Sequence, residues 1–366
     1  MKTLAAVLRT AGAARPYSQS KPLVLEELTL SGPRAGELLV RIEAAGVCHS
    51  DVSVVDGSRI RPLPMALGHE AAGIVEQIGP GVRDVREGDR VVLAFVPSCG
   101  SCAECAAGRP SLCVPGAGAN GQGHLLHGPP LLRDAGGGEV KHHLGCSAFA
   151  TYAVVARESA TVVPQDVPGE IAALFGCAAL TGVGAVLETA RVRPGQSVAI
   201  FGLGGVGLAA VMGAVLARAQ PIVAIDPVAS KRKLALELGA TSALSPEEAV
   251  GLSVDFAFEA AGTAPVLEAA FKALKRGGTA VAIGLPHPSK TITLPALAFA
   301  GEGKALIGSY MGSASPQRDV PRYIALYKSG ALPIDKLRTS ELPLERINEA
   351  FELLAAGEAV RQILRP

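Results

Sequence analysis

A glycine motif between a strand-like run and a helix-like run constrains the fold of this chain more than any other feature. Directly after the apolar stretch SVAIF, six consecutive residues form the pattern G-x-G-x-x-G: Gly202, Leu203, Gly204, Gly205, Val206 and Gly207. The first glycine permits a tight turn, the second lets the backbone approach a pyrophosphate, and the third lets helix and strand pack closely. Because the N-terminus of the following helix would face the anion, this stretch predicts a dinucleotide-binding site.

Strand-like and helix-like segments alternate around this motif, as they do in proteins with a parallel sheet. Apolar strand-like runs occur at 197–202, 221–226, 254–262 and 279–284. Helical patterns separate them at 207–219, 230–239 and 264–276. Buried strands that alternate with helices are typical of a doubly wound α/β sheet, so 179–310 is predicted to form a Rossmann domain. Residues 1–178 carry many short β segments broken by Gly and Pro, which predicts a β-barrel-like domain.

An acidic residue indicates which dinucleotide is bound. Asp226 ends the strand-like run that follows the glycine motif. A carboxylate at this position accepts hydrogen bonds from the ribose hydroxyls and repels a 2′-phosphate, which favours NAD over NADP. Lys231, in the next helical pattern, is a further candidate for contact with the ribose.

Composition and charge exclude several classes of protein. The 366 residues are 49% hydrophobic and 18% charged, with a formal net charge of +1. Without a basic stripe, nucleic acid is not an expected partner. The apolar run before Arg9 is too short for a secretory signal, so a cytoplasmic location is expected. The uncharged stretch 194–217 is rich in glycine and divides into a strand and a helix, so no membrane helix is expected.

Four of the seven cysteines form a compact cluster. Cys99, Cys102, Cys105 and Cys113 have the spacing C-x2-C-x2-C-x7-C within 95–115. Four thiolates in one loop suit a closed, tetrahedral, structural zinc site. An iron–sulfur cluster is the alternative, because the first three spacings match a ferredoxin pattern. The fourth cysteine, however, comes later than in that pattern and is followed by Val114 instead of proline.

Several motifs together resemble one known family. GVCHSD, GHEAAGIVEQIGPGV, the four-cysteine loop, GCAALTGVGA and FGLGGVG occur in the order seen in zinc-dependent medium-chain alcohol dehydrogenases, and the similarity spans essentially the whole chain. The resemblance implies a GroES-like catalytic domain at 1–178 and 311–366, and a Rossmann NAD-binding domain at 179–310. It further implies an oxidoreductase that reversibly transfers hydride between an alcohol and NAD and gives an aldehyde or ketone.

The resemblance also implies roles for particular residues. Cys48, His69 and Cys177 would hold a catalytic zinc, which makes two zinc ions per subunit with the four-cysteine site. Asp51 would accept a hydrogen bond from the His69 ring, Glu70 would lie behind the metal, and Ser50 would take the proton of the alcohol. By the same matching, further cofactor contacts are His49, Thr181, Ile283, Gly284, Leu285 and Arg361. The substrate-pocket walls are Phe95, His143 and Leu144.

The chain departs from the family pattern in two ways. The proton relay often ends in a histidine where this chain has Ser53, so the relay would end at water. Relatives that use glutathione-bound formaldehyde carry acids where this chain has Arg59 and Arg61, which argues against glutathione adducts. The alternatives to the main hypothesis are a formaldehyde dehydrogenase for another thiol adduct, such as a mycothiol type, a zinc-free quinone or enoyl reductase, and a nucleotide-sensing protein that is not an enzyme.

The expected partners are a small alcohol and the corresponding aldehyde or ketone. The apolar stretch 291–310 would form the sheet edge through which relatives pair. The long, weakly periodic segment 114–145, which is predicted to be a loop, resembles that of dimeric members. A homodimer is therefore expected in preference to a homotetramer.

Overall fold

The computed structural model describes all residues 1–366 and divides the chain into two compact units. The first unit contains 1–177, 315–324 and 338–366, and the second contains 178–314 and 325–337. The sequence prediction assigned 178 and 311–314 to the first domain, although they belong to the second unit, and it assigned 325–337 to the first domain as well. In the structure this segment belongs to the second unit, where its short helix Ile334–Leu337 packs against helix α7 (Gly205–Leu216).

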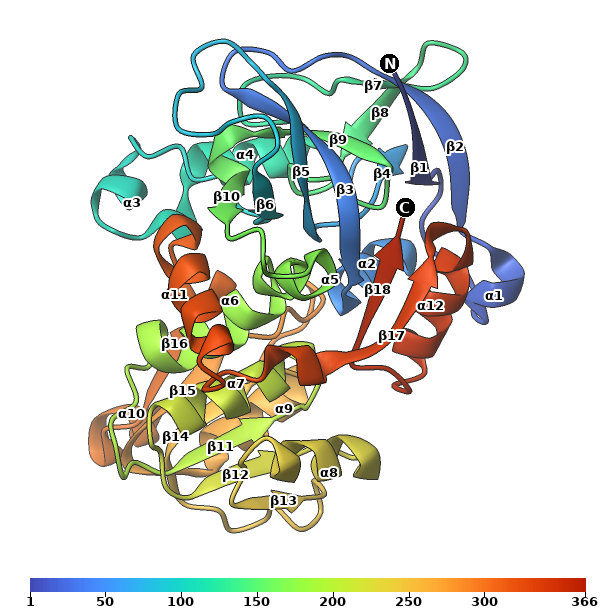
Figure 1. Ribbon diagram of the computed structural model, residues 1–366. Coiled ribbons are helices and arrows are strands. Elements are labelled where there is room, and N and C mark those ends of the chain that lie inside the picture. The colour runs from blue at the N-terminus through green and yellow to red at the C-terminus, as the bar shows by residue number, and fades with distance from the viewer. The chain divides into compact units, whose positions relative to one another are not determined.

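The first unit is built from a closed barrel and a larger sheet, both visible in Figure 1. The barrel strands, in order, are β1 (Lys2–Leu8), β2 (Leu23–Leu30), β7 (Leu132–Arg133), β8 (Glu139–His142) and β4 (Met65–Ala66). The sheet has the order β10 (Ala160–Val163), β6 (Arg90–Leu93), β5 (Glu70–Ile78), β3 (Glu37–Val47), β18 (Arg361–Arg365) and β17 (Arg338–Pro343), and β9 (Tyr152–Ala156) also pairs with β3. The prediction of a GroES-like barrel domain is confirmed.

Short helices connect the strands of this unit. They are α1 (Tyr17–Ser20), α2 (His49–Val55), α3 (Ala103–Ala106), α4 (Val114–Gln122), α5 (Gly169–Ala172) and α12 (Ile347–Ala355), and α11 (Pro316–Lys328) begins in this unit. Aliphatic and aromatic side chains from the strands and from α12 form one buried core. In this core the Phe149 and Phe351 rings meet edge to face, with their centroids 6.0 Å apart.

The second unit is a parallel six-stranded sheet with helices between its strands. The strand order is β13 (Ser242–Leu244), β12 (Ile222–Ile225), β11 (Val198–Phe201), β14 (Val254–Glu259), β15 (Leu274–Ala282) and β16 (Ala305–Gly308), and all pairs are parallel. The other helices are α6 (Ala178–Gly184), α8 (Ala229–Glu237), α9 (Ala264–Lys272) and α10 (Ala296–Glu302). The predicted doubly wound sheet is confirmed, with β11 followed directly by the glycine motif and α7.

The segment predicted to be a loop contains a helix and two strands. Helix α4 begins at Val114, with Pro115 in its first turn and the Cys113 thiol accepting a hydrogen bond from the Gly116 N–H. Its sequence, VPGAGANGQ, has three glycines, and glycine is a poor helix former. The start of this helix is therefore stabilised by its cap and its place in the fold more than by local propensity.

No single helix of the protein is long and apolar enough to cross a membrane, and only a bent pair of short helices, 169–175 and 178–189, meets the length and composition criteria when taken together.

Candidate active site

Neighbouring antiparallel strands bring Cys48 and His69 together. Strand β3 ends just before Cys48, and β5 begins just after His69. In their register Gly46 lies opposite Glu70. A Cβ on Gly46 would meet Glu70 Oε1 at 2.2 Å, so only glycine leaves room for the carboxylate at this point.

Cys177 reaches the same region because the chain before it packs closely on strand β6, which pairs with β5. A Cβ on Gly176 would lie 2.3 Å from the Leu93 carbonyl oxygen, so glycine is required for this approach. The Cys48 and Cys177 Sγ atoms are 4.0 Å apart, and His69 offers a ring nitrogen within 4.8 Å of both. All three side chains are buried.

This set fits a bound metal ion. Two thiols and one imidazole are a ligand combination that zinc uses in catalytic sites, where the fourth position stays open. The structure gives independent support, because both carboxylate oxygens of the fully buried Glu70 have no hydrogen-bond partner. Burial raises the pKa of Glu70 to about 7, although Arg361 opposes this shift. A divalent cation would balance the thiolates and this carboxylate together.

Asp51 holds two of the three candidate metal ligands, Cys48 and His69. It caps helix α2, and its Oδ2 accepts a hydrogen bond from the Cys48 N–H at 3.1 Å. Its Oδ1 lies 2.8 Å from His69 Nδ1. Burial opposes ionisation of Asp51, but its pKa is lowered because the His69 and His143 rings outweigh that effect. This contact occupies Nδ1 and leaves His69 Nε2 for a metal.

Arg361, predicted to contact cofactor phosphate, is buried beside the metal-ligand set in this structure. Its Nε lies 3.3 Å from Glu70 Oε1, and its Nη1 donates a hydrogen bond to the Val47 carbonyl oxygen at 3.3 Å. A buried guanidinium next to a buried carboxylate reduces the cost of placing that charge out of water. In this arrangement Arg361 stabilises Glu70 and the end of β3.

The residues next to Cys48 point to different surroundings. His49, predicted to contact the pyrophosphate, is exposed at the start of α2, and Ser50 is half-buried in the same turn. The Ser53 hydroxyl donates a hydrogen bond to the His49 carbonyl oxygen at 3.1 Å. Ser53 is therefore bonded within its own helix.

The predicted pocket walls pack around the His69 ring. Phe95 meets it edge to face, with ring centroids 5.6 Å apart, and His143 does the same at 5.5 Å. Leu144 is buried and has a left-handed backbone conformation with φ of 51°. The role of His143 toward Asp51, described below, was not predicted. No spacing pattern links residues so far apart in the sequence, so only the fold could have revealed it.

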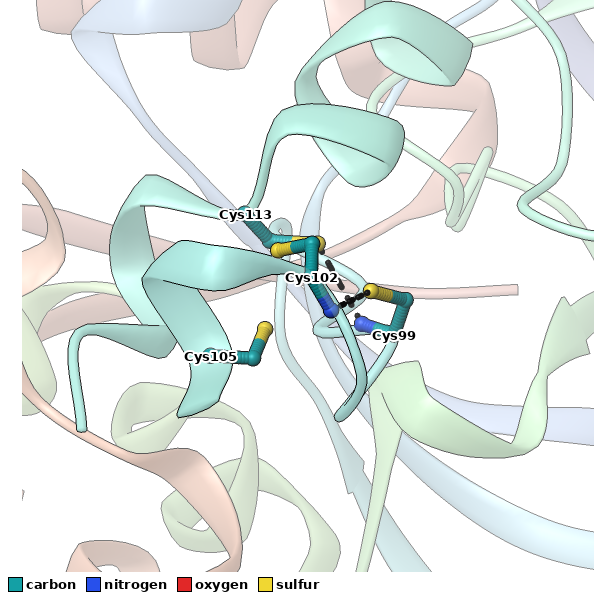
Figure 2. Close-up of side chains that lie close together, drawn as sticks. All are labelled: Cys99, Cys102, Cys105 and Cys113. Atoms are coloured by element: carbon teal, nitrogen blue, oxygen red, sulfur yellow. Dashed lines mark hydrogen bonds between the residues drawn. The ribbon is translucent and has the colours of Figure 1, made fainter. Parts of the chain in front are cut away.

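The four-cysteine loop forms a second cluster of metal-ligand type, shown in Figure 2. All four thiols are free, and their Sγ atoms lie within 4.8 Å of one another. Backbone N–H groups of Cys99 and Gly116 donate to Cys113 Sγ, and that of Cys102 donates to Cys99 Sγ. Backbone N–H groups lower the pKa of Cys99 to about 6. Such donors stabilise thiolates, so the loop suits a metal held by four cysteines.

The glycine motif in the second unit has the geometry of a dinucleotide loop. Gly202 has φ of 93°, which favours glycine. A Cβ on Gly207 would lie 1.8 Å from the Gly202 carbonyl oxygen, whereas a Cβ on Gly204 would meet nothing within 4 Å. Close packing at the third glycine and open space at the second are what a bound pyrophosphate requires.

Asp226 is fixed beside this loop at the end of β12. Its Oδ2 accepts a hydrogen bond from the Leu203 N–H and its Oδ1 from the Val228 N–H, both at 2.8 Å. Lys231 is half-buried in α8. The carboxylate thus lies next to the motif, where the sequence pattern predicted it.

The remaining predicted cofactor residues of this unit follow strand β15 or lie in helix α6. Ile283 is buried and Leu285 is 46% exposed. Gly284 packs so closely that a Cβ would meet the Gly262 N at 2.3 Å. Thr181 is buried in α6, and its hydroxyl has no hydrogen-bond partner. Buried polar groups without partners are rare, so this hydroxyl is a candidate for contact with a ligand.

Comparison with known proteins connects both units to one family. The family pattern described as "Alcohol dehydrogenase GroES-like domain" matches 34–165, and "Zinc-binding dehydrogenase" matches 205–329. An NDMA-dependent alcohol dehydrogenase from Amycolatopsis methanolica is 38% identical, covering 100% of this chain and 99% of the relative. A geraniol dehydrogenase from Castellaniella defragrans is also 38% identical, covering 98% of this chain and 96% of the relative.

A solved structure agrees with these relatives. The benzyl alcohol dehydrogenase from Acinetobacter calcoaceticus is similar with a TM-score of 0.90 and 32% identity, covering 100% of this chain and 99% of that chain. The similarity extends over both units and both cysteine sets. The chain is an oxidoreductase that belongs to the zinc-dependent medium-chain alcohol dehydrogenase family.

Proposed function

We propose that this protein is a zinc- and NAD-dependent dehydrogenase that reversibly oxidises an alcohol to an aldehyde or ketone. The observation that carries the proposal is the buried Cys48, His69 and Cys177 set, which provides three ligands and leaves a fourth position for the substrate. When bound there, zinc supplies a Lewis acid that polarises the substrate oxygen. A second zinc, held by the four-cysteine loop, would stabilise that loop.

The chain's own residues orient the ligands and move the proton. Asp51 holds the His69 ring in the tautomer that leaves Nε2 for the metal. The Ser50 hydroxyl, in the first turn of α2, takes the alcohol proton. Because Ser53 is bonded to the His49 carbonyl oxygen, we infer that the proton passes from Ser50 to the cofactor ribose and then to water.

We infer that the cofactor is NAD and not NADP. The inference is supported by the Asp226 carboxylate, which lies beside the glycine motif and would repel a 2′-phosphate. Replacing Asp226 with serine is expected to raise the ratio of kcat/KM for NADP to that for NAD by at least about tenfold, since one charge contact is worth about 1.4 kcal/mol or more. An unchanged ratio would show that another group selects the cofactor.

The relatives named above support a proposal for the substrate class. Geraniol and benzyl alcohol are both primary alcohols in which the carbinol carbon adjoins an sp2 carbon. The flat rings of Phe95 and His143 beside His69 suit a planar group at that place. We infer an allylic or aromatic primary alcohol, to be tested against saturated and secondary alcohols of similar size.

The decisive test of the function uses three matched cysteine variants. Cys48→Ser and Cys177→Ser are expected to lose one zinc per subunit and nearly all alcohol oxidation, while Cys146→Ser keeps both. Cys146 is a suitable control because it is also buried but lies outside the ligand set, with its Sγ 3.8 Å from the Ala94 carbonyl oxygen. The assay follows NADH formation and, because one relative is named NDMA-dependent, reduction of NDMA as well. Full metal content and turnover in Cys48→Ser would refute the site.

We also propose a cytoplasmic homodimer. Strand β16 pairs only with β15, so its other side is an open sheet edge within the chain. Such edges favour pairing with a second copy. All seven cysteines of the chain are free, and six of them belong to the two proposed zinc sites. Free thiols of this kind suit the reducing cytoplasm.

A further inference from the structure

The Asp51 carboxylate contacts a second imidazole besides that of His69. His143 Nδ1 lies 3.3 Å from Asp51 Oδ1, the same oxygen that lies 2.8 Å from His69 Nδ1. All three side chains are buried. The His69 and His143 rings meet edge to face at 88°. The His143 contact is an ion–dipole contact without the direction of a full hydrogen bond, and it involves the carboxylate oxygen that does not contact the Cys48 N–H.

The backbone that carries His143 is a tight and constrained turn. Leu144 and Ser147 both have left-handed φ angles, 51° and 50°, which are costly for residues other than glycine. The Ser147 hydroxyl accepts a hydrogen bond from the His143 N–H at 2.9 Å and donates one to the Ala66 carbonyl oxygen at 2.8 Å. The N–H groups of Cys146 and Ser147 both donate to the His143 carbonyl oxygen. The ring therefore projects from a backbone with little freedom to move.

We propose that His143 is a positioning residue that braces Asp51, and through it the metal ligand His69, from the 143–147 turn. The inference rests on the proposed zinc site and adds to it a residue outside the ligand set. A carboxylate oxygen has two lone pairs, so Oδ1 can interact with both imidazoles while Oδ2 accepts a hydrogen bond from the Cys48 N–H. Asp51 is thereby held by three groups from three segments of the chain. Groups that orient metal ligands contribute strongly to metal retention.

The test compares two amides of different reach. The Asn side chain places its amide nitrogen near the Nδ1 position of histidine, whereas the Gln amide reaches the Nε2 position. His143→Asn is therefore expected to keep the contact with Asp51, and His143→Gln is expected to lose it. His142→Gln is the matched control, because His142 is equally buried but its Nε2 accepts a hydrogen bond from the Leu131 N–H.

The measurement is the rate at which zinc passes from the intact protein to a chelator. The relevant zinc is the one that Cys48→Ser removes. We expect His143→Gln to release it about tenfold faster than wild type, the lower end of the effect of losing a group that orients a ligand. His143→Asn and His142→Gln should release it at close to the wild-type rate. The Co2+-substituted proteins provide a second readout, since only His143→Gln should shift the visible spectrum.

Three results would overturn the inference. Equal release rates for the Asn and Gln variants of His143 would mean that the contact with Asp51 does not matter. Equally fast release in His142→Gln would indicate general loosening of the turn. If the Cys48→Ser variant contains as much zinc as the wild-type protein, the proposed function is overturned, and this inference with it.

Discussion

Neighbouring residues at the active site have different partners because helix α2 begins between them. Cys48 is the N-cap, with extended φ and ψ of −117° and 152°, and its Sγ lies 4.0 Å from Cys177 Sγ. His49 is the first helical residue and faces outward, and Asp51 turns back to the Cys48 N–H and to His69. The start of α2 thus directs the side chains of Cys48, His49 and Asp51 into three different surroundings.

Replacing Ser53 with histidine is expected to raise turnover near neutral pH, by up to about tenfold. A general base contributes about 10²–10⁴-fold where proton transfer limits the rate, and here it would take over only the last transfer to water. The measurement is the pH–rate profile of kcat, with Ser53→Ala as the control that removes the hydroxyl without adding a base. Superimposable profiles for wild type and the histidine variant would mean that proton escape does not limit the rate.

His142 is expected to reduce stability in acid. Burial lowers the pKa of His142 to about 3, and its Nε2 accepts the Leu131 N–H, so the folded protein keeps the ring neutral. The unfolded chain binds a proton below about pH 6.5, so stability present above that pH is lost as the pH falls toward 3. The titration of His142 alone should lower the free energy of unfolding by about 2 kcal/mol between pH 7 and pH 5.

The His142→Gln variant isolates this contribution. Its amide oxygen can accept the same N–H but does not titrate. Urea unfolding at pH 7 and pH 5 should show a smaller loss of stability in the variant, by about 2 kcal/mol. If wild type and variant lose the same amount, protonation of His142 does not oppose folding.

At the scale of elements, the sequence predicts strands and helices that have a regular apolar pattern. It does not predict elements whose unfavourable local sequence is offset by contacts elsewhere in the fold. The runs at 197–202 and 221–226 became β11 and β12, because parallel strands buried on both faces are continuously apolar. Helix α4 was missed, because its three glycines conceal a helix that is stabilised by the Cys113 cap. The contact between His143 and Asp51 was also beyond prediction, since it depends on a turn with two left-handed residues.

Two glycines of the same loop are expected to respond differently to alanine. Gly204→Ala should melt like wild type, because its Cβ would meet nothing within 4 Å. It should nevertheless bind NADH at least about tenfold more weakly, since the methyl group would occupy the space that the pyrophosphate needs. Gly207→Ala should lose about 1–3 kcal/mol of stability, because its Cβ would lie 1.8 Å from the Gly202 carbonyl oxygen.

Thermal melting and NADH titration of both variants test this difference. Weakened binding without destabilisation is the result expected only for Gly204→Ala. Wild-type affinity in that variant would mean that the pyrophosphate does not lie against the second glycine.

At the scale of the whole molecule, the chain forms its units from separate segments, and the six-stranded sheet of the second unit ends at β13 on one side and at β16 on the other. The Ser309 N–H donates to the Ala282 carbonyl oxygen across β15. Because N–H groups alternate in direction along a strand, the Gly308 N–H faces the open edge of β16. A homodimer that pairs through this edge would use that donor.

Gly308→Pro is therefore expected to weaken dimerisation by about tenfold or more, because proline removes the donor and blocks edge pairing. Gly308→Ala is the control, as a Cβ there meets nothing within 4 Å and the N–H is kept. Sedimentation velocity over a range of concentrations measures the effect. A proline variant that remains as dimeric as the alanine variant would place the interface elsewhere.

We propose that Cys48, His69 and Cys177 hold a catalytic zinc and that the four-cysteine loop holds a separate zinc. An anomalous difference map from crystals of the wild-type protein, measured on both sides of the zinc edge, tests this most directly. We expect two peaks per chain, one among Cys48 Sγ, His69 Nε2 and Cys177 Sγ, and one among the sulfurs of Cys99, Cys102, Cys105 and Cys113. Zinc peaks at the four-cysteine loop alone, in crystals grown with excess zinc, would contradict it.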